Sequence, residues 1–363
     1  MKTSSLKKIL TLGAAVAALT FTSNLRAAVS VFIEGGSASQ SILFDRATNL
    51  FAGGSFTSTG TGSSTVRRFQ GSSLNPTLSG YGTITLDINV ASGAINGLVA
   101  LVNQNADVND TNVLGQQTVP TFVDSATSPE AVGIDSVAAN LVELPTYVVP
   151  LVFVKNANFP DVNAITNLTQ RQAVSLETST NKATFYGGSS SNVIYFVGRN
   201  SQAAVRTEVD LNIYNSGSIK TFTNNAAGLP VQDTSADPGQ PSGGAVANTV
   251  LALTNSIGTV AVQNLKSTLV PIAYEGVNYS VSNVINGSYP IWGYEHYYYI
   301  ASPNTGSPST PQLAVINAFY QSVTNASFQN INNPVFTNNF VPNSALKVKR
   351  DYDGGPIKPL PGY

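Results

Sequence analysis

Three stretches of this chain repeat one plan, in which a short apolar strand passes through a small polar turn into an amphipathic helix. The stretches are 29–51, 83–104 and 192–213. In the last of them Val205 and Val209 are four residues apart, which is the spacing of one helix face. Units that alternate strands and helices favour parallel sheets with helices packed against them. The sequence therefore predicts an α/β fold with mostly parallel sheets.

The turns of these units are candidate anion sites, because a helix N-terminus offers free backbone N–H groups and the positive end of the helix dipole. Arg199 adds a fixed charge directly after the third strand, and Ser201 lies in position to cap the following helix. Serine hydroxyls mark the other turns, at Ser37, Ser39 and Ser92. Ligands of α/β proteins bind outside the carboxyl ends of the strands, so we expect these turns to meet around a small anion. Ordinary N-capping is the simpler explanation of any single serine.

Composition points to export. Charged residues make up only 10% of the 363 residues, against ~25% in ordinary soluble proteins, so uncharged polar side chains must cover the surface. Three lysines near the N-terminus precede an apolar run at 9–21, and small residues lead to Ala27. This pattern predicts a secretory signal peptide over residues 1–27, with an apolar run too short to span a membrane. We therefore expect a periplasmic or secreted protein with no membrane span in its mature chain.

The sequence carries no recognisable catalytic or metal-binding pattern. His296 is the only histidine and there is no cysteine, so a Ser–His–Asp arrangement would rest entirely on His296, for which we expect a structural role. No Gly-Lys-Ser or Gly-Lys-Thr follows a glycine-rich loop, and the acidic residues lack metal-ligand spacing. A net charge of −1 without a strongly basic block argues against nucleic acid as a partner. The sequence predicts a binding protein without catalytic residues, cofactor or metal.

Two further segments have less regular patterns. Residues 53–82 are rich in Gly, Ser and Thr and contain Arg67 and Arg68, which predicts an insertion folded over one face of a domain. The two arginines are then solvated charges or, alternatively, ligand contacts. The longest apolar strand-like run is 143–154, and its two prolines argue for a hinge or a sheet edge.

Six short motifs are spread across most of the mature chain. They are GGSASQSI (35–42), ITLDINVASGAINGLVALVNQNADVN (84–109), YVVPLVFVKN (147–156), NLTQRQ (167–172), NSIGTVAV (255–262) and NGSYPIWGYEHYYYI (286–300). Their order and spacing resemble those of the phosphate-binding proteins of bacterial phosphate ABC importers, which have the type II periplasmic binding protein-like fold. The resemblance implies two α/β lobes that are joined by two hinge strands and enclose the ligand. It places residues 29–121 and 269–363 in lobe 1, with the insertion 53–82, and residues 144–264 in lobe 2.

The resemblance also implies a set of ligand-binding residues. Carried over onto this sequence they are Ser37, Ala38, Ser39, Ser92, Gly93, Thr111, Asn112, Arg199, Ser201, Gln202 and Ala203. The sequence departs from the family pattern at Ala203 and Val205, which replace a serine and a threonine. It departs again at Asn112, where the family has the acidic residue that accepts the phosphate proton. Each lost hydrogen bond to a charged ligand would cost about 1.5–3 kcal/mol.

The function that the resemblance implies is that of an exported, monomeric solute-binding protein. It would enclose a small oxyanion, with phosphate as the first candidate, and deliver it to an ABC permease. The alternative is an exported or envelope protein outside transport that keeps the scaffold but binds a different ligand or a protein partner. Ala203 and Val205 favour this alternative, whereas Arg199 and the Ser92-Gly93 turn favour the first. An extracellular hydrolase with His296 as its base is a more distant third.

Overall fold

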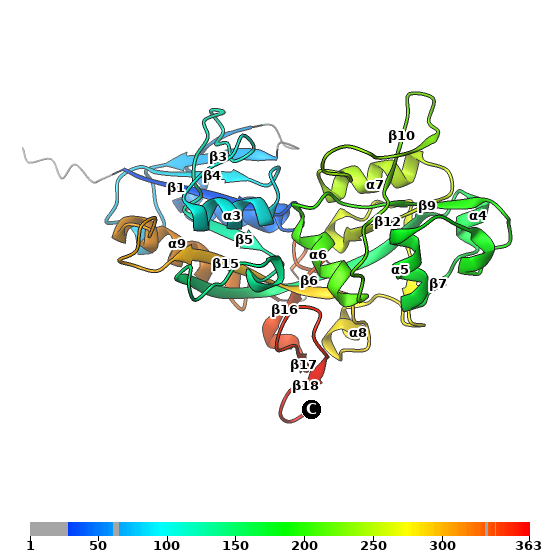
Figure 1. The fold of residues 1–363 in the computed structure, drawn as a ribbon. Helices are drawn as coiled ribbons and strands as arrows, with labels where there is room; N and C mark the ends of the chain where they lie inside the picture. Colours follow the sequence, from blue (N-terminus) through cyan, green and yellow to red (C-terminus); the bar gives the residue numbers. More distant parts are fainter. Residues whose placement is uncertain (1–27, 61–64, 331–332, 338) are drawn as a thin grey trace, which may run out of the picture.

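The computed structural model describes residues 28–60, 65–330, 333–337 and 339–363, so the predicted signal peptide at 1–27 lies outside the described residues. Within the described residues, one twelve-stranded sheet runs through the molecule (Figure 1). Its strands, in spatial order, are β2 (Thr57–Thr59), β3 (Val66–Gly71), β4 (Ile84–Asn89), β1 (Val29–Gly35), β5 (Phe122–Ser125), β15 (Trp292–Ile300), β6 (Leu141–Asn156), β12 (Ser256–Ala261), β9 (Val193–Val197) and β8 (Asn181–Lys182). Two short strands also pair with β6, namely β13 (Leu269–Pro271) and β16 (Val341–Pro342).

The three predicted strand–turn–helix units are present. β1 leads into α2 (Gln40–Thr48), β4 into α3 (Ala94–Asn103) and β9 into α6 (Ala204–Asn212). β1 pairs in parallel with β4 and β5, and β12, which follows α7 (Gly243–Ala252), pairs in parallel with β9. The predicted α/β fold is confirmed. Antiparallel pairing comes from β2, β3, β6, β8 and β15, which lie outside these units.

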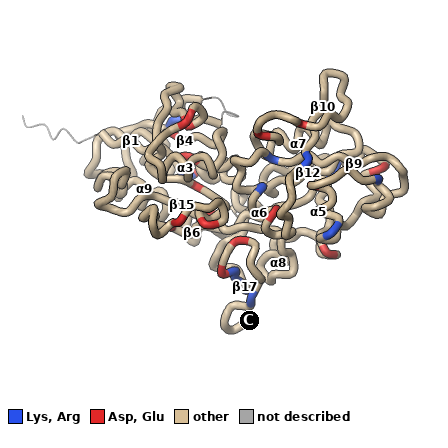
Figure 2. Tube along the Cα trace, viewed as in Figure 1, with Lys and Arg blue, Asp and Glu red and all other residues tan. Residues whose placement is uncertain are grey.

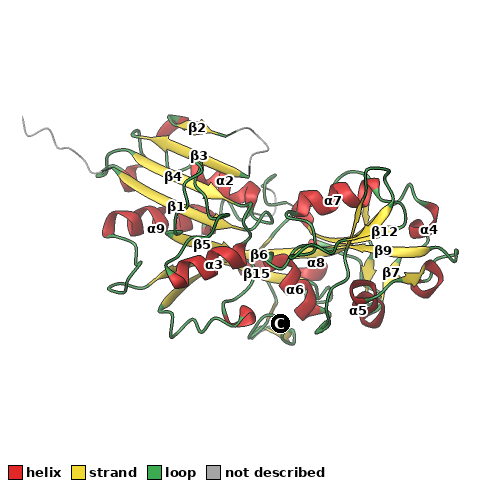
Figure 3. Ribbon diagram, turned by 45° about the horizontal axis from the view of Figure 1, so that its top comes forward, coloured by secondary structure: helices red, strands yellow, loops and turns green. Residues whose placement is uncertain are grey.

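β6 joins the two halves of the sheet. We call β1 to β5 the first strand group, and β8, β9 and β12 the second strand group. The residues from Leu141 to Pro150 of β6 pair with β15, which borders the first group, whereas Leu151 to Lys155 pair with β12 of the second group. Figure 3 shows β6 running from one group to the other. One apolar core continues across both groups and includes Ile33, Val152 and Ile257.

The prediction that the prolines mark a hinge or a sheet edge agrees with the pairing of β6. Within the described residues, positions 141–146 of β6 pair only with β15, so Pro145 lies on an edge of the sheet, and Pro150 lies where β6 passes from β15 to β12. Pro145 lies where the pairing with β15 shifts, since Tyr147 pairs with Glu295 and Pro145 with the next residue, His296. Thr146 is therefore an extra residue in β6, as in a β-bulge. Both a sheet edge and a bulge accept a residue without a backbone N–H, which explains how β6 accommodates Pro145.

Residues 53–82 do not fold over a face of the sheet as predicted. Instead, β3 pairs antiparallel with β4, and β2 pairs with β3 to form the edge of the first strand group. Arg68 donates from Nε and Nη2 to Asp87, each at 2.7 Å, and the Arg67 guanidinium lies over the rings of Phe44 and Phe69. Both arginines therefore have structural contacts within this edge.

The remaining elements surround the sheet. They are α4 (Pro160–Asn163), β7 (Asn167–Leu168), α5 (Gln170–Thr178), β10 (Phe222–Asn224), β11 (Pro230–Gln232), β14 (Ala273–Tyr274), α8 (Val281–Ile285), α9 (Thr310–Thr324), β17 (Val348–Lys349) and β18 (Lys358–Pro359). β13 pairs with β6 and β14 with β7, so both lie beside the second strand group. The lobe boundaries at residues 121, 144, 264 and 269 stay predictions. None of the described helices is long and apolar enough to cross a membrane.

Candidate ligand site between the two strand groups

The turns predicted to form a site meet around a cavity of about 10 Å³ between the two strand groups. Its lining residues come from the turns before α2, α3 and α6, from the starts of α3 and α6, from the loop after β5 and from β15. They are Gly36, Ser37, Ala38, Gly93, Ala94, Ala126, Arg199, Ala203, Ala204, Val205 and Glu295. The structure thus brings together five of the predicted site residues, namely Ser37, Ala38, Gly93, Arg199 and Ala203.

Arg199 supplies the positive charge of this cavity and is only 3% exposed. Its guanidinium donates to the backbone oxygens of Gln240 and Pro241, both at 3.0 Å, and to Ser37 Oγ at 3.2 Å. Burial lowers the pKa of Arg199 to about 10, so the side chain is still a cation at neutral pH. Ser37 Oγ also accepts the backbone N–H of Gly243, at the N-terminus of α7, at 3.2 Å. A single buried oxygen therefore receives one cationic donor and one helix N-terminal donor.

Other contacts join the two strand groups directly. The Ile95 N–H at the start of α3 donates to the Gln202 carbonyl at 3.3 Å, and Thr127 Oγ1 donates to the Ala204 carbonyl at 2.9 Å. Gly93 makes the first contact possible. Its φ is +95°, and a Cβ at this position would lie 2.4 Å from the Gln202 carbonyl oxygen. The two turns approach so closely because one of them has no side chain.

The other predicted site residues lie outside the cavity lining. Ser92 donates to the buried Glu34 carboxyl, and Ser39 is fully buried before α2. The Asn112 side chain organises its own loop and accepts the backbone N–H groups of residues 114 and 116, while the neighbouring Thr111 carbonyl accepts Asn89 Nδ2. Ser201 is exposed, and its N–H donates to Asp237. The prediction that Ser201 caps the helix is wrong, because α6 begins only at Ala204.

Sequence reasoning missed the buried acids beside the cavity. Glu295 of β15 lines the cavity and is 1% exposed, and Asp124 of β5 is fully buried. Burial raises the pKa of Asp124 to about 7, and burial together with the neighbouring Asp124 raises the pKa of Glu295 well above its usual value. A signal was available, because each carboxyl interrupts an otherwise apolar or aromatic strand, in FVDS and in WGYEHYYYI.

His296 lies away from this cavity. It lines a separate cavity of about 590 Å³ between β15 and the C-terminal segment that carries β17 and β18. Its Nδ1 lies 2.7 Å from Glu143 Oε1, and its ring stacks on Tyr298. The hydrogen bond from His296 lowers the pKa of Glu143. Among the described residues, no three His, Cys, Asp or Glu side chains are grouped so that they could hold a metal ion.

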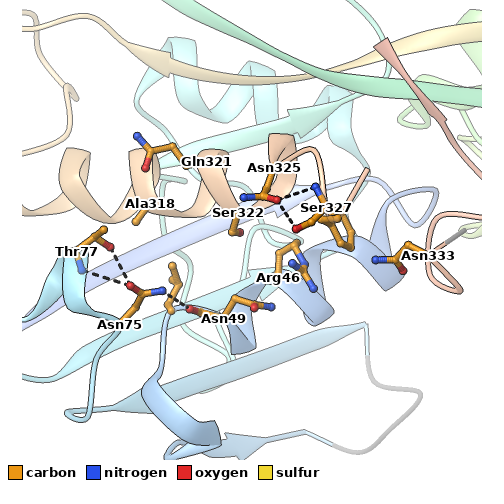
Figure 4. Close-up of a pocket in the computed structure, with 12 residues that line it drawn as sticks. Arg46, Asn49, Asn75, Thr77, Ala318, Gln321, Ser322, Asn325, Ser327 and Asn333 are labelled. Carbon is orange, nitrogen blue, oxygen red and sulfur yellow. Dashed lines mark hydrogen bonds between the residues drawn. The ribbon is translucent and has the colours of Figure 1, made fainter. Parts of the chain in front are cut away.

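A third pocket, of about 480 Å³, opens near the C-terminal ends of α2 and α9 (Figure 4). Amides and hydroxyls make up most of its walls, and some of them bond one another: Asn325 Oδ1 accepts Ser327 Oγ, and Asn75 Oδ1 accepts the N–H of Thr77. None of the predicted site residues lines it. Charged residues are sparse along the whole chain (Figure 2), so the buried Arg199 is an unusual feature of this molecule.

Comparison with known proteins identifies the fold. No family model matches the chain, and no curated protein matches it. Among solved structures, the chain is similar to a putative phosphate ABC transporter substrate-binding protein with bound phosphate from Clostridium perfringens, at 14% identity and a TM-score of 0.57, over 86% of this chain and 99% of that chain. It is also similar to an ABC-type phosphate transport receptor from Vibrio cholerae, at 13% identity and a TM-score of 0.49, over 80% of this chain and 93% of that chain. The first similarity confirms the two-lobed α/β fold predicted from the sequence.

Proposed function

We propose that the protein is an exported solute-binding protein that serves uptake by an ABC permease. It holds a small oxyanion between the two strand groups, and phosphate is the first candidate. The arrangement at Ser37 Oγ is the observation that supports this proposal. That oxygen accepts Arg199 Nη1 and the Gly243 N–H, and an oxyanion oxygen would accept the same two donors. The protein of similar fold from Clostridium perfringens has phosphate bound.

The proposal requires the two strand groups to move apart. A cavity of about 10 Å³ holds roughly one water molecule, which is far less than a phosphate ion needs. Separation about β6, which pairs with strands on both sides, would break the Ser37–Arg199 contact and free both donors for the ligand. Ser37 then satisfies the donors while the two strand groups lie together, and the anion satisfies them when it binds.

A second candidate is an exported or envelope protein outside transport that keeps the scaffold. The bonding inside the cavity favours it, because protein oxygens accept the three hydrogen bonds that the Arg199 guanidinium donates. Ala203 and Val205 line the cavity without hydroxyls, so this turn has lost two donors of the family pattern.

Export through a signal peptide at 1–27, a periplasmic or secreted location and a monomeric state belong to the same proposal. They rest on the sequence pattern described above and on the fold shared with an ABC substrate-binding protein.

Calorimetry of the purified mature protein with phosphate, sulfate, arsenate and molybdate tests the proposal. We expect phosphate to bind with a Kd below about 10 μM, roughly −7 kcal/mol. Arg199→Ala should weaken binding at least about 100-fold, because charge-assisted hydrogen bonds to the ligand are lost. Arg171→Ala, a change at an exposed arginine of α5, is the matched control and should bind as the wild type does. Absence of binding heat with all four anions would overturn the proposal in favour of the second candidate.

A further inference from the structure

One wall of the candidate cavity carries a buried carboxyl group that lies beside a second buried acid. Glu295 lines the cavity and is 1% exposed, and its carboxyl interacts with the Asp124 carboxyl and the Ser39 hydroxyl. Within the described residues, neither of its oxygens has a hydrogen-bond partner of ordinary geometry. Buried polar atoms in proteins are nearly always well paired, so a weakly paired carboxyl at a cavity wall has bonding capacity left for a ligand.

The surroundings of Glu295 decide its protonation. The titratable and charged groups that face it from the packed elements are Asp124 of β5, Tyr147 of β6, Tyr297 of β15 and Glu208 of α6, with Arg199 on the same cavity. A buried carboxylate is costly, and the nearby acids add like charge. The pKa of Glu295 is accordingly raised well above its usual value, which favours the protonated side chain. A protonated carboxyl has an O–H that can donate.

We propose that Glu295 donates a hydrogen bond to the bound oxyanion and so replaces the hydroxyls that this chain lacks at Ala203 and Val205. All three residues line the same cavity, and Arg199 lines it as well. This inference rests on the proposed function. It also defines the form of the ligand, because a donor from the protein pairs best with an ionised oxygen that carries no proton of its own. The site therefore takes the more ionised form of a small oxyanion.

The proposal predicts how affinity depends on pH. As the pH rises and the pair of Asp124 and Glu295 loses its protons, the donor disappears and a buried negative charge faces the anion. Affinity must then fall. Phosphate itself changes charge over the same range, but every variant meets the same phosphate, so a difference between two pH profiles reports on the protein alone.

The experiment measures phosphate affinity by calorimetry between pH 5.5 and 8.5 for the wild type, Glu295→Gln and Glu295→Leu. Glutamine keeps a donor that does not titrate, so the wild-type affinity should fall at least about tenfold relative to that of Glu295→Gln across this range. Leucine keeps neither the donor nor the charge, so Glu295→Leu should bind at least about tenfold more weakly than the wild type at pH 5.5. Glu177→Gln changes a buried acid of α5 with a similarly raised pKa, and should keep the wild-type profile.

Two outcomes would overturn the inference alone: a Glu295→Gln profile parallel to that of the wild type, or wild-type affinity in Glu295→Leu. If Glu295→Leu does not fold, the Glu295→Gln comparison decides. A wild-type protein that binds no phosphate at any pH would overturn the proposed function and this inference together, which distinguishes the two failures.

Discussion

The Ser37 hydroxyl oxygen accepts the two hydrogen bonds that we assign to an oxygen of the bound ligand. It accepts Arg199 Nη1 and the Gly243 N–H, each at 3.2 Å, inside a region where water has little access. Leaving a buried donor without an acceptor costs more than a typical hydrogen bond contributes. The Ser37 contact therefore stabilises the closed arrangement of the two strand groups.

Ser37→Ala should lower the free energy of unfolding by about 1–3 kcal/mol in phosphate-free buffer, because two buried donors lose their acceptor. Added phosphate should restore much of this loss, since its oxygens can accept both donors. Urea denaturation with and without phosphate measures both effects. Ser73→Ala, at an exposed serine, is the control and should change stability by less than about 0.5 kcal/mol. Unchanged stability in Ser37→Ala would contradict the role given to this hydroxyl.

Asp124 makes the stability of the protein depend on pH. Burial raises its pKa to about 7 in the folded state, so the folded protein keeps a proton that the unfolded chain releases above its ordinary value of 3.8. Its contribution to stability is complete below the unfolded pKa and is lost as the pH rises to about 7. The slope for one such proton is about 1.4 kcal/mol per pH unit.

Asp124→Asn should therefore flatten the decline in the free energy of unfolding between about pH 4 and pH 7, because asparagine has no proton to lose. Urea denaturation at several pH values across this window measures the slope. Glu130→Gln, at an exposed acid, should keep the wild-type slope. Parallel curves for Asp124→Asn and the wild type would show that the buried carboxyl does not hold a proton.

At the scale of elements, the start of α3 is pressed against the turn before α6 through Gly93. A methyl group at this position would meet the Gln202 carbonyl at 2.4 Å, whereas one at Gly115 would meet nothing within 4 Å. Both glycines have positive φ, at +95° and +73°, so alanine at either position costs about 1–2 kcal/mol of backbone strain. Gly115→Ala therefore isolates the strain from the collision.

Gly93→Ala should lower the free energy of unfolding by at least about 2 kcal/mol more than Gly115→Ala, because the turns must separate to make room for the methyl group. It should also weaken phosphate binding, since the same turns line the cavity. Urea denaturation and calorimetry measure the two effects. Equal stability losses in the two variants would mean that the close approach of these turns does not hold in solution.

A second element, the C-terminal segment, fastens the far end of α6. The Arg350 guanidinium donates to the Trp292 carbonyl at 3.2 Å, to the Pro290 carbonyl and to Asn212 of α6, and it lies 4.2 Å from the centroid of the Trp292 ring. Asp353 accepts the Ser128 N–H at 2.6 Å from the loop after β5. This segment therefore connects α6 to β15 and to the loop that follows β5 of the first strand group.

Arg350→Met should lower the free energy of unfolding by about 3 kcal/mol, because it leaves buried acceptors on β15 and α6 without their donor. Lys349→Met is the matched control. Lys349 is 49% exposed and pairs with Asp351 at the surface, so its loss should cost less than about 1 kcal/mol. Similar losses in both variants, measured by urea denaturation, would argue that Arg350 does not fasten α6.

At the scale of the whole molecule, local periodicity predicted the α/β units because each unit buries one face of its own helix. The same reasoning placed Arg199 in the turn between β9 and α6, where the structure has it, since a strand that runs into a helix fixes the turn between them. It failed where long-range pairing decides the outcome. The segment 53–82, expected over a face of a domain, instead pairs as the edge strands β2 and β3. Glu295 reaches the cavity because β15 passes between the two strand groups, and no local pattern shows that path.

The most direct test of the central claim is a crystal structure of the protein grown with arsenate, which anomalous scattering can locate. We predict arsenate between the two strand groups, with an oxygen at about 2.7–3.2 Å from both Arg199 Nη1 and the Gly243 nitrogen. Ser37 Oγ should no longer accept either donor. Arsenate bound elsewhere, or bound while the Ser37–Arg199 hydrogen bond is intact, would contradict the account.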